Sequence, residues 1–273
     1  MNTYVYVDTV VFTVNQDRST DESGDPLDPA DRLEVLVMHR PEAAAGMWAL
    51  PGSLAREDED LPATALRTVR EETGLSLNPR HIHQVAAYGH PGRDSRWRAV
   101  SVAYMALVPR PALADGTLEG HSDGAQFRPY RSLRHKDPPV LEFDHHEIIY
   151  DARKAALRLL EDRTAVFSFL PKKFSMTDMR LVYEAFLQQR IDPANFRRKV
   201  EAVEDLVVPL DEWTDSAGRR GRPAQLYAVG PRSRPSGSKE TNRIDPPIRF
   251  RRMHNGSETA VPADHARRRA KKP

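Results

Sequence analysis

The sequence predicts an α+β protein with two folded units and a basic tail. Its length of 273 residues is enough for two domains. Apolar residues alternate in several segments before residue 165, and after it they recur at helical spacing. Residues 231–273 carry 12 Lys and Arg against 4 Asp and Glu and show no periodicity. We therefore expect strands to dominate the first unit, helices to open the second, and the tail to be disordered.

The first unit is expected to begin with a hairpin and a helix. Residues 3–14 and 33–40 are rich in Val, Leu and Tyr and predict two strands. Residues 15–31, which connect them, are acidic and contain Gly, Pro and Ser, so they predict a flexible loop. Residues 61–73 place apolar side chains at helical spacing and end at Gly74, which suits the position after a helix.

Two more strands and a long helix are predicted before residue 165. Residues 82–89 and 99–108 are strand-like and flank a turn at 91–96. Residues 144–161 form an amphipathic pattern with Asp144 as the expected N-cap. The His-His pair that follows Asp144 does not predict a metal site, because adjacent residues of a helix point in different directions.

The second unit is predicted to begin with two short helices. Apolar residues between 174 and 187 fall on one helical face, and Ser175 with Asp178 has the spacing of a capped helix start. Residues 192–204 predict the next helix, because an Asp-Pro pair suits its first two positions.

Composition excludes several classes of protein. The chain has no cysteine, so disulfides, thiolate catalysis and cysteine-based zinc sites are ruled out. Its mean hydropathy is −0.62, and no apolar run is long enough to cross a membrane. The N-terminus lacks a basic segment followed by an apolar core, so we expect no secretory signal and a cytoplasmic protein. The tail has a net charge of +8, which leaves −6 for the first 230 residues and indicates a nucleic-acid partner or a basic arm.

The segment from Ser53 to Leu75 resembles the Nudix box, in which a Gly, a Glu and an Arg-Glu-apolar-x-Glu-Glu-x-Gly-apolar run stand at fixed spacing. The resemblance implies the Nudix fold, an α/β/α sandwich with a mixed sheet. Ser53 replaces the loop Gly and Thr68 replaces the first acid of the run. Seven of the nine defined positions match: Glu59, Arg67, Val69, Glu71, Glu72, Gly74 and Leu75.

The box places carboxylates where a divalent cation would need them. Positions 68, 71 and 72 share one helix face, and Mg²⁺ prefers oxygen ligands that it can share with a diphosphate. Thr68 removes one anionic ligand, so catalysis is expected to be lost. Glu71 and Glu72 are candidate residual Mg²⁺ ligands, or else a solvated acidic face. For Arg67 and Glu59 we favour a pairing that steadies the loop.

An altered Nudix site can bind a nucleoside diphosphate without cleaving it. Arginine side chains are the natural partners of the phosphates. Each candidate could equally be a surface charge. The candidates for effector binding are Arg40, Arg56, Arg93 and Arg98.

The second helix of the second unit is a candidate DNA-reading helix. Phe196, Val200 and Val203 form its inward stripe, so the polar residues of the helix face out. Asn pairs well with adenine and Arg with guanine in the major groove. Alternatively, Asn195 only starts the helix and the basic residues form a solvated face. The candidate contacts to DNA here are Asn195, Arg197, Arg198 and Lys199, with Lys172 and Lys173 at phosphates.

A candidate wing follows the helices. Residues 206–210 and 224–229 predict two short strands. The loop between them holds Arg219, Arg220 and Arg222, and its Arg-Gly-Arg-Pro core resembles the AT-hook, whose arginines enter the narrow minor groove of A·T tracts.

Both halves together resemble the NrtR family, the Nudix-related transcriptional regulators of NAD metabolism. The resemblance rests on FSMTDM from residue 174, YEA from 183, NFRRK from 195 and GRPAQLY from 221. It spans about residues 1–230 and implies a Nudix-like sensing domain at 1–163 and a winged helix-turn-helix domain at 164–230. The basic tail at 231–273 and the loop at 15–31 are not explained by it. It further implies a homodimer that represses NAD biosynthesis or salvage genes on a double-stranded DNA operator, with ADP-ribose or a related NAD derivative as effector and no required cofactor.

Two other functions fit the same sequence. An active Nudix hydrolase would use Mg²⁺ to cleave ADP-ribose or a similar nucleoside diphosphate, and Thr68 counts against it. A non-specific nucleic-acid binder would depend on the tail alone, so that deletion of residues 231–273 would abolish binding to DNA.

Overall fold

The computed structural model describes residues 2–16, 27–40, 47–110, 124–133, 141–162, 164–214, 223–231 and 247–250. One seven-stranded sheet forms the first domain, with the strand order β3-β2-β1-β6-β5, β4 beside β1 and β7 beside β2. The strands are β1 (Tyr4–Val14), β2 (Leu33–Arg40), β3 (Met47–Ala49), β4 (Gly52–Leu54), β5 (Ile82–Tyr88), β6 (Ala99–Leu107) and β7 (Ala125–Pro129).

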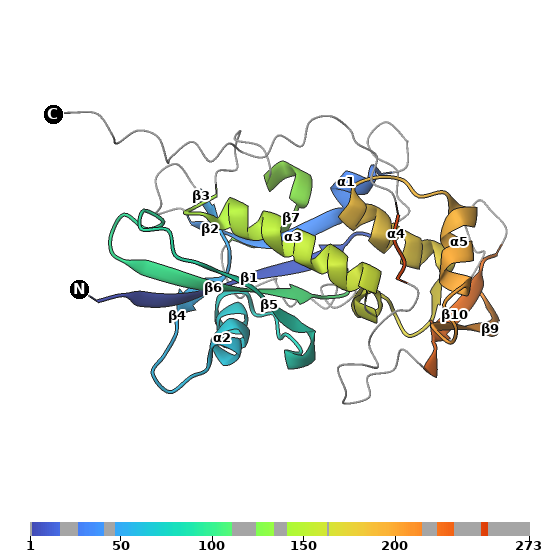
Figure 1. Ribbon diagram of the computed structural model, residues 1–273, viewed down its shortest axis with the longest axis horizontal. Coiled ribbons are helices and arrows are strands. Elements are labelled where there is room, and N and C mark those ends of the chain that lie inside the picture. The colour runs from blue at the N-terminus through green and yellow to red at the C-terminus, as the bar shows by residue number, and fades with distance from the viewer. Residues whose placement is uncertain are drawn as a thin grey trace.

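The sheet is mixed and has a long helix on each face. Strands β1 and β6 run parallel, whereas the other named pairs are antiparallel. Helix α3 (His145–Asp162) covers one face and helix α2 (Leu61–Thr73) the other (Figure 1). The alternation of β1 serves both faces, because Val10 and Phe12 join the core under α3 while Val11 joins the core under α2. The α/β/α sandwich expected from the box is confirmed.

The local signals of the sequence are largely confirmed. Helix α2 has the predicted bounds, with Asp60 as its N-cap and Gly74 at φ 74°, a left-handed conformation that favours glycine. The predicted hairpins are the antiparallel pairs β1–β2 and β5–β6. Asp144 does precede α3, but its carboxylate accepts hydrogen bonds from Arg93 (2.6 and 2.9 Å).

The expected loop at 15–31 is only partly a loop. Residues Pro29–Arg32 form helix α1, because Asp28 caps the amide of Ala30 and Pro29 suits the first turn. Arg32 donates to the carbonyl of Asn15 (3.0 Å), which joins both ends of the connection. Residues 17–26 lie outside the described part of the chain.

The second domain is a winged helix. Strand β8 (Phe174–Ser175) precedes helices α4 (Met176–Leu187) and α5 (Pro193–Glu201), and β9 (Val207–Trp213) and β10 (Gln225–Val229) follow. The three strands pair in the order β8-β10-β9. The capping box of Ser175 and Asp178 is confirmed, and so is Asp192 as the N-cap of α5. The expected inward stripe of α5 is buried as well.

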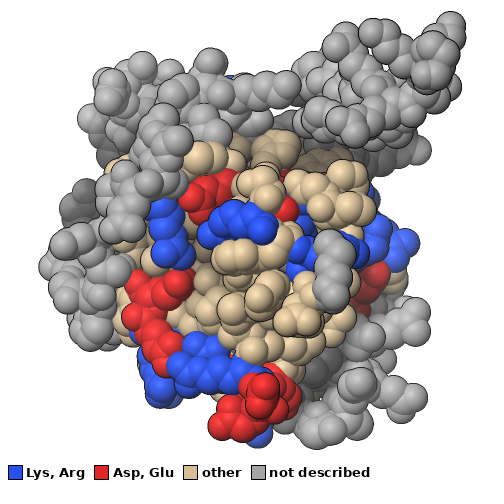
Figure 2. Space-filling model, turned by 90° about the vertical axis from the view of Figure 1, so that its left-hand side faces the viewer, with Lys and Arg blue, Asp and Glu red and all other residues tan. Residues whose placement is uncertain are grey.

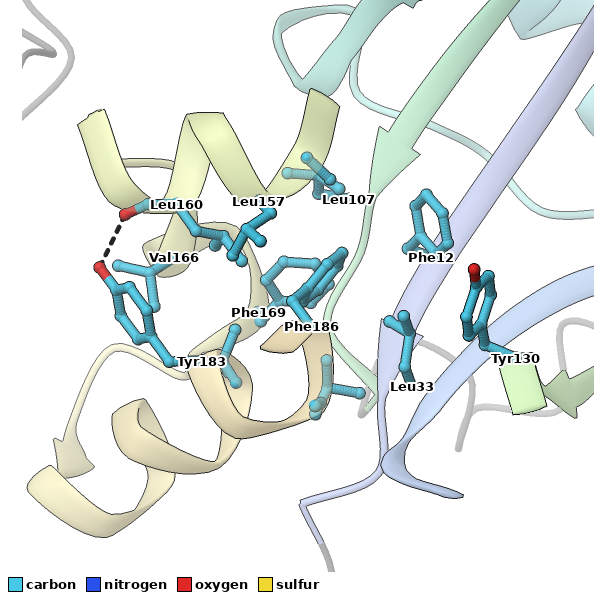
Figure 3. Packing of buried hydrophobic residues seen from close by; sticks show 14 of the residues in the cluster. Phe12, Leu33, Leu107, Tyr130, Leu157, Leu160, Val166, Phe169, Tyr183 and Phe186 are labelled. Carbon is cyan, nitrogen blue, oxygen red and sulfur yellow. Dashed lines mark hydrogen bonds between the residues drawn. The ribbon is translucent and has the colours of Figure 1, made fainter. Parts of the chain in front are cut away.

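The two domains share one hydrophobic core, which we call the seam. A 3₁₀ helix at Thr164–Phe169 leads from α3 into the second domain. The ring of Phe186 on α4 meets Phe12 of β1 and Phe169 at centroid distances of 5.6 and 5.5 Å. The buried Tyr183 hydroxyl donates to the carbonyl of Leu160 (2.7 Å), as Figure 3 shows. The packed core therefore extends from the sheet of the first domain into α4 of the second.

Part of the tail was expected to be disordered but is described as packed. Residues 247–250 pack against the helices, and Ile248 is only 1% exposed. Among the residues that the structure describes, no helix is both long enough and apolar enough to cross a membrane.

Candidate effector and DNA-binding sites

The two substituted positions of the box lie against each other. Thr68 points inward from α2 and is 1% exposed, and its hydroxyl shares a hydrogen bond of 2.5 Å with the hydroxyl of Ser53 on β4. A neutral pair thus joins helix and strand where the family pattern has an acid and a glycine. A carboxylate buried at position 68 would need a cation or a donor to compensate its charge.

The pair of Arg67 and Glu59 holds the loop before α2, as expected. The guanidinium donates to both carboxylate oxygens of Glu59 at 2.8 and 2.9 Å. Arg67 also donates to the carbonyl of Leu54 and to Glu71. The hydrogen bonds from Arg67 lower the pKa of Glu59 from 4.5 to about 2. These bonds fix the position of β4 relative to the helix.

The two remaining acids of the box are bound by arginines. Glu71 pairs with Arg67 (2.9 Å) and Arg56 (3.5 Å). Glu72 pairs with Arg40 (3.2 Å) and accepts from the backbone amide of Gly52 (3.1 Å). Burial raises the pKa of Glu72, and Arg40 and the amide only partly offset this effect. The structure therefore brings Arg40 and Arg56 to one helix face, each on a neighbouring acid.

This donor set does not fit a Mg²⁺ site. Within the described ranges, no three His, Cys, Asp or Glu residues are grouped so that they could hold a metal. The carboxylates of Glu71 and Glu72 accept hydrogen bonds from guanidinium and amide donors. The third position of the box that would supply a ligand, residue 68, carries the buried hydroxyl of Thr68.

A buried charge network lies behind the same face. Arg93, whose side chain is 4% exposed, bridges Asp144 and Asp8. Asp8 also accepts from Ser101 (2.6 Å), and the Nε2 of His145 lies 3.6 Å from it. Burial tends to raise the pKa of Asp8, but His145, Ser101 and Arg93 together hold it below its ordinary value. The guanidinium of Arg93 is thus bound within the protein.

Two other residues define how this network is built. The Nδ1 of His145 accepts from the amide of Leu50 (3.1 Å), so the histidine holds the segment that follows β3. Gly52 is required by space, because a Cβ there would lie 2.2 Å from the Oδ1 of Asp8. Since the amide of Gly52 binds Glu72, the glycine connects the buried network to the acids of α2.

An exposed aromatic group lies at the end of the sheet where β1 begins. The Arg96 guanidinium lies over the rings of Trp97 (4.5 Å) and Phe143 (5.4 Å), and Tyr4 contacts Trp97. Phe143 is 46% exposed and has φ 52°, a conformation unusual for a bulky residue. Figure 2 shows this end of the molecule, where an uncharged area is bordered by side chains of both signs. The sequence analysis missed this group because its members come from three separate segments.

Arg98 lies apart from the other candidates. It donates to the backbone carbonyls of Gly89 (2.8 Å) and Ala99 (3.1 Å) and so closes the hairpin of β5 and β6. Of the four arginines predicted at the effector site, Arg40 and Arg56 face the acids of α2, Arg93 is buried in the network, and Arg98 holds backbone.

The turn between α4 and α5 is fixed by a buried acid that sequence reasoning did not single out. Glu184 is 3% exposed, is paired with Arg180, and accepts from the amide of Ile191 (2.7 Å). Gln188 ends α4 in a left-handed conformation. Because Glu184 bonds to both helix and turn, it sets the angle at which α5 leaves α4.

The basic residues of α5 lie on its solvent side, and two of the three have their partners within the winged helix. Arg197 bonds to Glu201 (2.7 Å) and to the hydroxyl of Tyr227 (3.0 Å). Arg198 donates to the side chain of Asn195 (3.0 Å), which orders both groups. Lys199 donates to a carbonyl of the tail.

Of the candidate DNA contacts that flank α5, the structure describes the two lysines before α4 but not the arginines of the wing. Lys172 is exposed, and Lys173 is exposed and paired with Glu212 of β9 (2.6 Å). The base of the wing is closed by the bond from Thr214 to the carbonyl of Ala224 (2.8 Å). The candidate wing residues Arg219, Arg220 and Arg222 lie outside the described residues.

Comparison with known families matches both halves of the chain. Residues 26–152 match the NUDIX domain, and residues 166–229 match the NrtR DNA-binding winged helix domain. Residues 153–165, which include the second half of α3, lie between the two matches.

Individual relatives extend over most of the chain. An ADPR responsive transcriptional repressor NtrR of Acinetobacter baylyi is 29% identical over 224 residues, which are 81% of this chain and 80% of that protein. A Shewanella oneidensis NrtR structure, solved in complex with a 27mer DNA, has a TM-score of 0.68 and 27% identity, and the match covers 90% of this chain and 99% of that one. An ADP-ribose pyrophosphatase of Methanocaldococcus jannaschii is 29% identical over 123 residues, which are 44% of this chain and 66% of that protein.

Proposed function

The chain belongs to the NrtR family, and from that premise we propose that it is a DNA-binding transcriptional repressor whose Nudix domain senses ADP-ribose. The observation that carries this proposal is the seam. Because the sheet, α3 and the winged helix are built on one continuous core, a ligand that shifts the sheet or α3 can change the position of α5.

The face of α2 is suited to bind a diphosphate without cleaving it. Arg56 is 58% exposed and only loosely paired with Glu71, so its guanidinium can turn to a phosphate at small cost. Arg40 lies on the neighbouring acid. We assign these two arginines to the diphosphate of ADP-ribose, with the aromatic group around Trp97 as a stacking surface for the base. No step of this binding requires a metal.

On the DNA side, α5 enters the major groove. Asn195 and Arg198 face solvent near its N-terminal half and can read base edges, whereas Lys172 and Lys173 suit phosphates. As a homodimer, the protein would present two such helices to half-sites about 10 base pairs apart. We expect the operator to control NAD biosynthesis or salvage genes.

A gel-shift titration tests the proposal. Duplex DNA from upstream of the chain's own gene is titrated with the full-length protein at fixed salt, with and without ADP-ribose. We expect retardation below micromolar dimer and its loss with ADP-ribose. No retardation at any concentration up to about micromolar would refute DNA-binding by this protein at its own promoter.

Hydrolysis of ADP-ribose is the second candidate function, and the seven matching box positions favour it. The rate of ADP-ribose hydrolysis distinguishes the sensor from the hydrolase. With ADP-ribose, Mg²⁺ and a coupled phosphatase, a turnover near 1 s⁻¹, roughly the low end for enzymes, would favour the hydrolase. A Thr68→Glu variant that gains activity from an inactive parent would favour the sensor.

A further inference from the structure

The segment Pro247–Phe250, which we call the clasp, bridges the two domains. The amide of Ile248 donates to the carbonyl of Glu161 (3.0 Å), and Arg249 pairs with Asp162 (2.7 Å), both at the end of α3. Ile248 is buried in the common core. The first half of the clasp is therefore attached to the Nudix domain.

The other half of the clasp covers the helix that reads DNA. The ring of Phe250 stacks on Phe196 of α5 with an angle of 15° between the planes, and it meets Tyr183 of α4 edge-on. Lys199 of α5 donates to the carbonyl of Arg249 (2.7 Å) and lies 5.3 Å from the ring centre of Phe250. Six side-chain and backbone contacts thus reach three helices from three consecutive residues.

Helix α5 needs such support. It has nine residues, and helices this short are not stable alone, so packing must fix its position. Phe196 and Val200 anchor one side. The bonds of Arg197 reach Glu201 and Tyr227, both within the winged helix. The clasp adds a tie from α5 directly to the Nudix domain.

We propose that the clasp positions α5 relative to α3, so that operator affinity and its response to ADP-ribose depend on residues 247–250. This proposal rests on DNA binding as proposed above. Phe250 and Ile248 are its positioning residues, and Lys199 is held by the carbonyl of Arg249 and the ring of Phe250. The tail beyond residue 250 has seven Lys and Arg against two Asp and Glu and adds attraction to phosphates without setting position.

Docking of the clasp is tested first, without reference to DNA. The chain has no cysteine, so a single introduced thiol reports its own accessibility. We expect the thiol of an Ile248→Cys variant to react with a maleimide at least tenfold more slowly than that of a Pro247→Cys variant, since Pro247 is exposed and Ile248 is buried. Equal rates in two variants with unchanged circular dichroism would show that the clasp is not docked and would overturn the proposal.

Two truncations then test positioning. One ends at residue 250 and keeps the clasp, and the other ends at residue 246 and removes it. Affinity for the upstream duplex is measured well below the melting temperature at several salt concentrations. We expect the shorter chain to bind about tenfold more weakly than the longer truncation with the same salt dependence, because the phosphate contacts are common to both. It should also need a different ADP-ribose concentration for release.

The outcomes separate position from stability. If the shorter chain only melts at a lower temperature while affinity and ADP-ribose response match the longer one, the clasp is a structural brace and the positioning role is wrong. If the shorter chain does not fold, Phe250→Ala in the full chain takes its place, with Val208→Ala at an exposed position of β9 as the matched control. Failure of both full-length parent and truncations to bind DNA would contradict the proposed function instead.

Discussion

The face of α2 and the seam between the domains are built on opposite principles. The face of α2 is polar and partly exposed, and its acids are held by arginines whose bonds can be exchanged for a ligand. The seam is made of buried rings, with Phe186 between Phe12 and Phe169. Its contacts there are apolar, so they are not exchanged for contacts to a polar ligand. A rearrangement of ion pairs at the first region would be transmitted by the second, because a close-packed core moves as a unit.

The difference fits the proposed role of the first region, which is to bind a ligand without cleaving it. Substitution at Ser53 and Thr68 replaces a cation site by a hydrogen bond, whereas the strand–helix scaffold keeps its Glu59–Arg67 pair. The arginines that remain can bind a diphosphate. Binding energy formerly used for the transition state is then available to shift a conformational equilibrium.

The largest expected effect is the loss of unfolding free energy when a buried ring of the seam is removed. Phe186→Ala removes a fully buried ring and should lower the free energy of unfolding by about 3–5 kcal/mol. Val208→Ala, at an exposed position of β9, should change it by less than about 0.5 kcal/mol. Urea unfolding is followed by circular dichroism and tryptophan emission. Wild-type transitions that separate into two steps would show that the domains do not share their stability.

The second largest expected effect is the loss of stability caused by a steric clash at Gly52, behind the α2 face. Gly52→Ala places a methyl group 2.2 Å from the buried carboxylate of Asp8, and it should cost about 1–3 kcal/mol of unfolding free energy. Gly92→Ala is the matched control, since its nearest neighbour is an ordinary contact at 3.5 Å. Equal melting temperatures for the two variants would mean that Asp8 moves freely and that the buried network is not rigid.

The pair of Glu59 and Arg67 predicts a dependence of stability on pH. The pKa of Glu59 is about 2 in the folded protein against 4.5 ordinarily, so its contribution is complete above about pH 4.5 and is lost as the pH falls towards 2. Glu59→Gln should reduce stability at pH 7 by about 1–3 kcal/mol and flatten this part of the profile. A wild-type profile identical to that of the variant would exclude the pairing.

The smallest expected effect is on effector affinity. Arg40→Gln and Arg56→Gln each remove one partly exposed guanidinium, and each should weaken ADP-ribose binding by about 1 kcal/mol, or roughly fivefold. Thermal shift measures this, because a ligand of the folded state raises the melting temperature. Arg98→Gln should leave the shift unchanged, since Arg98 holds backbone carbonyls. A loss confined to Arg98→Gln would move the effector site to the β5–β6 hairpin.

Local chemistry explains what the sequence could predict. Asp60 caps the start of α2 and Gly74 ends it. In the winged helix, the capping box of Ser175 and Asp178 starts α4 and Asp192 caps α5. Such signals act over a few residues, so a pattern reveals them. The pairing of Arg67 with Glu59 is of the same kind, because the box fixes their spacing.

Local sequence patterns do not predict contacts between residues that lie far apart in the sequence. Arg93 was predicted as a surface contact to the effector, but its partners Asp8 and Asp144 lie far away in sequence and only the fold brings them together. The clasp was hidden for a related reason. Ile248 and Phe250 are isolated apolar residues in a basic stretch, and nothing local indicates that they pack against α3, α4 and α5.

The central claim is that an occupied α2 face releases DNA while the ligand stays whole. The most direct measurement follows protein bound to a fluorescent upstream duplex as ADP-ribose is added, and then assays the recovered ligand by chromatography. We predict a loss of DNA affinity of about 5- to 150-fold, the usual range of allosteric coupling, with ADP-ribose recovered intact. Unchanged DNA affinity at saturating ADP-ribose, or release that requires its cleavage, would contradict the account.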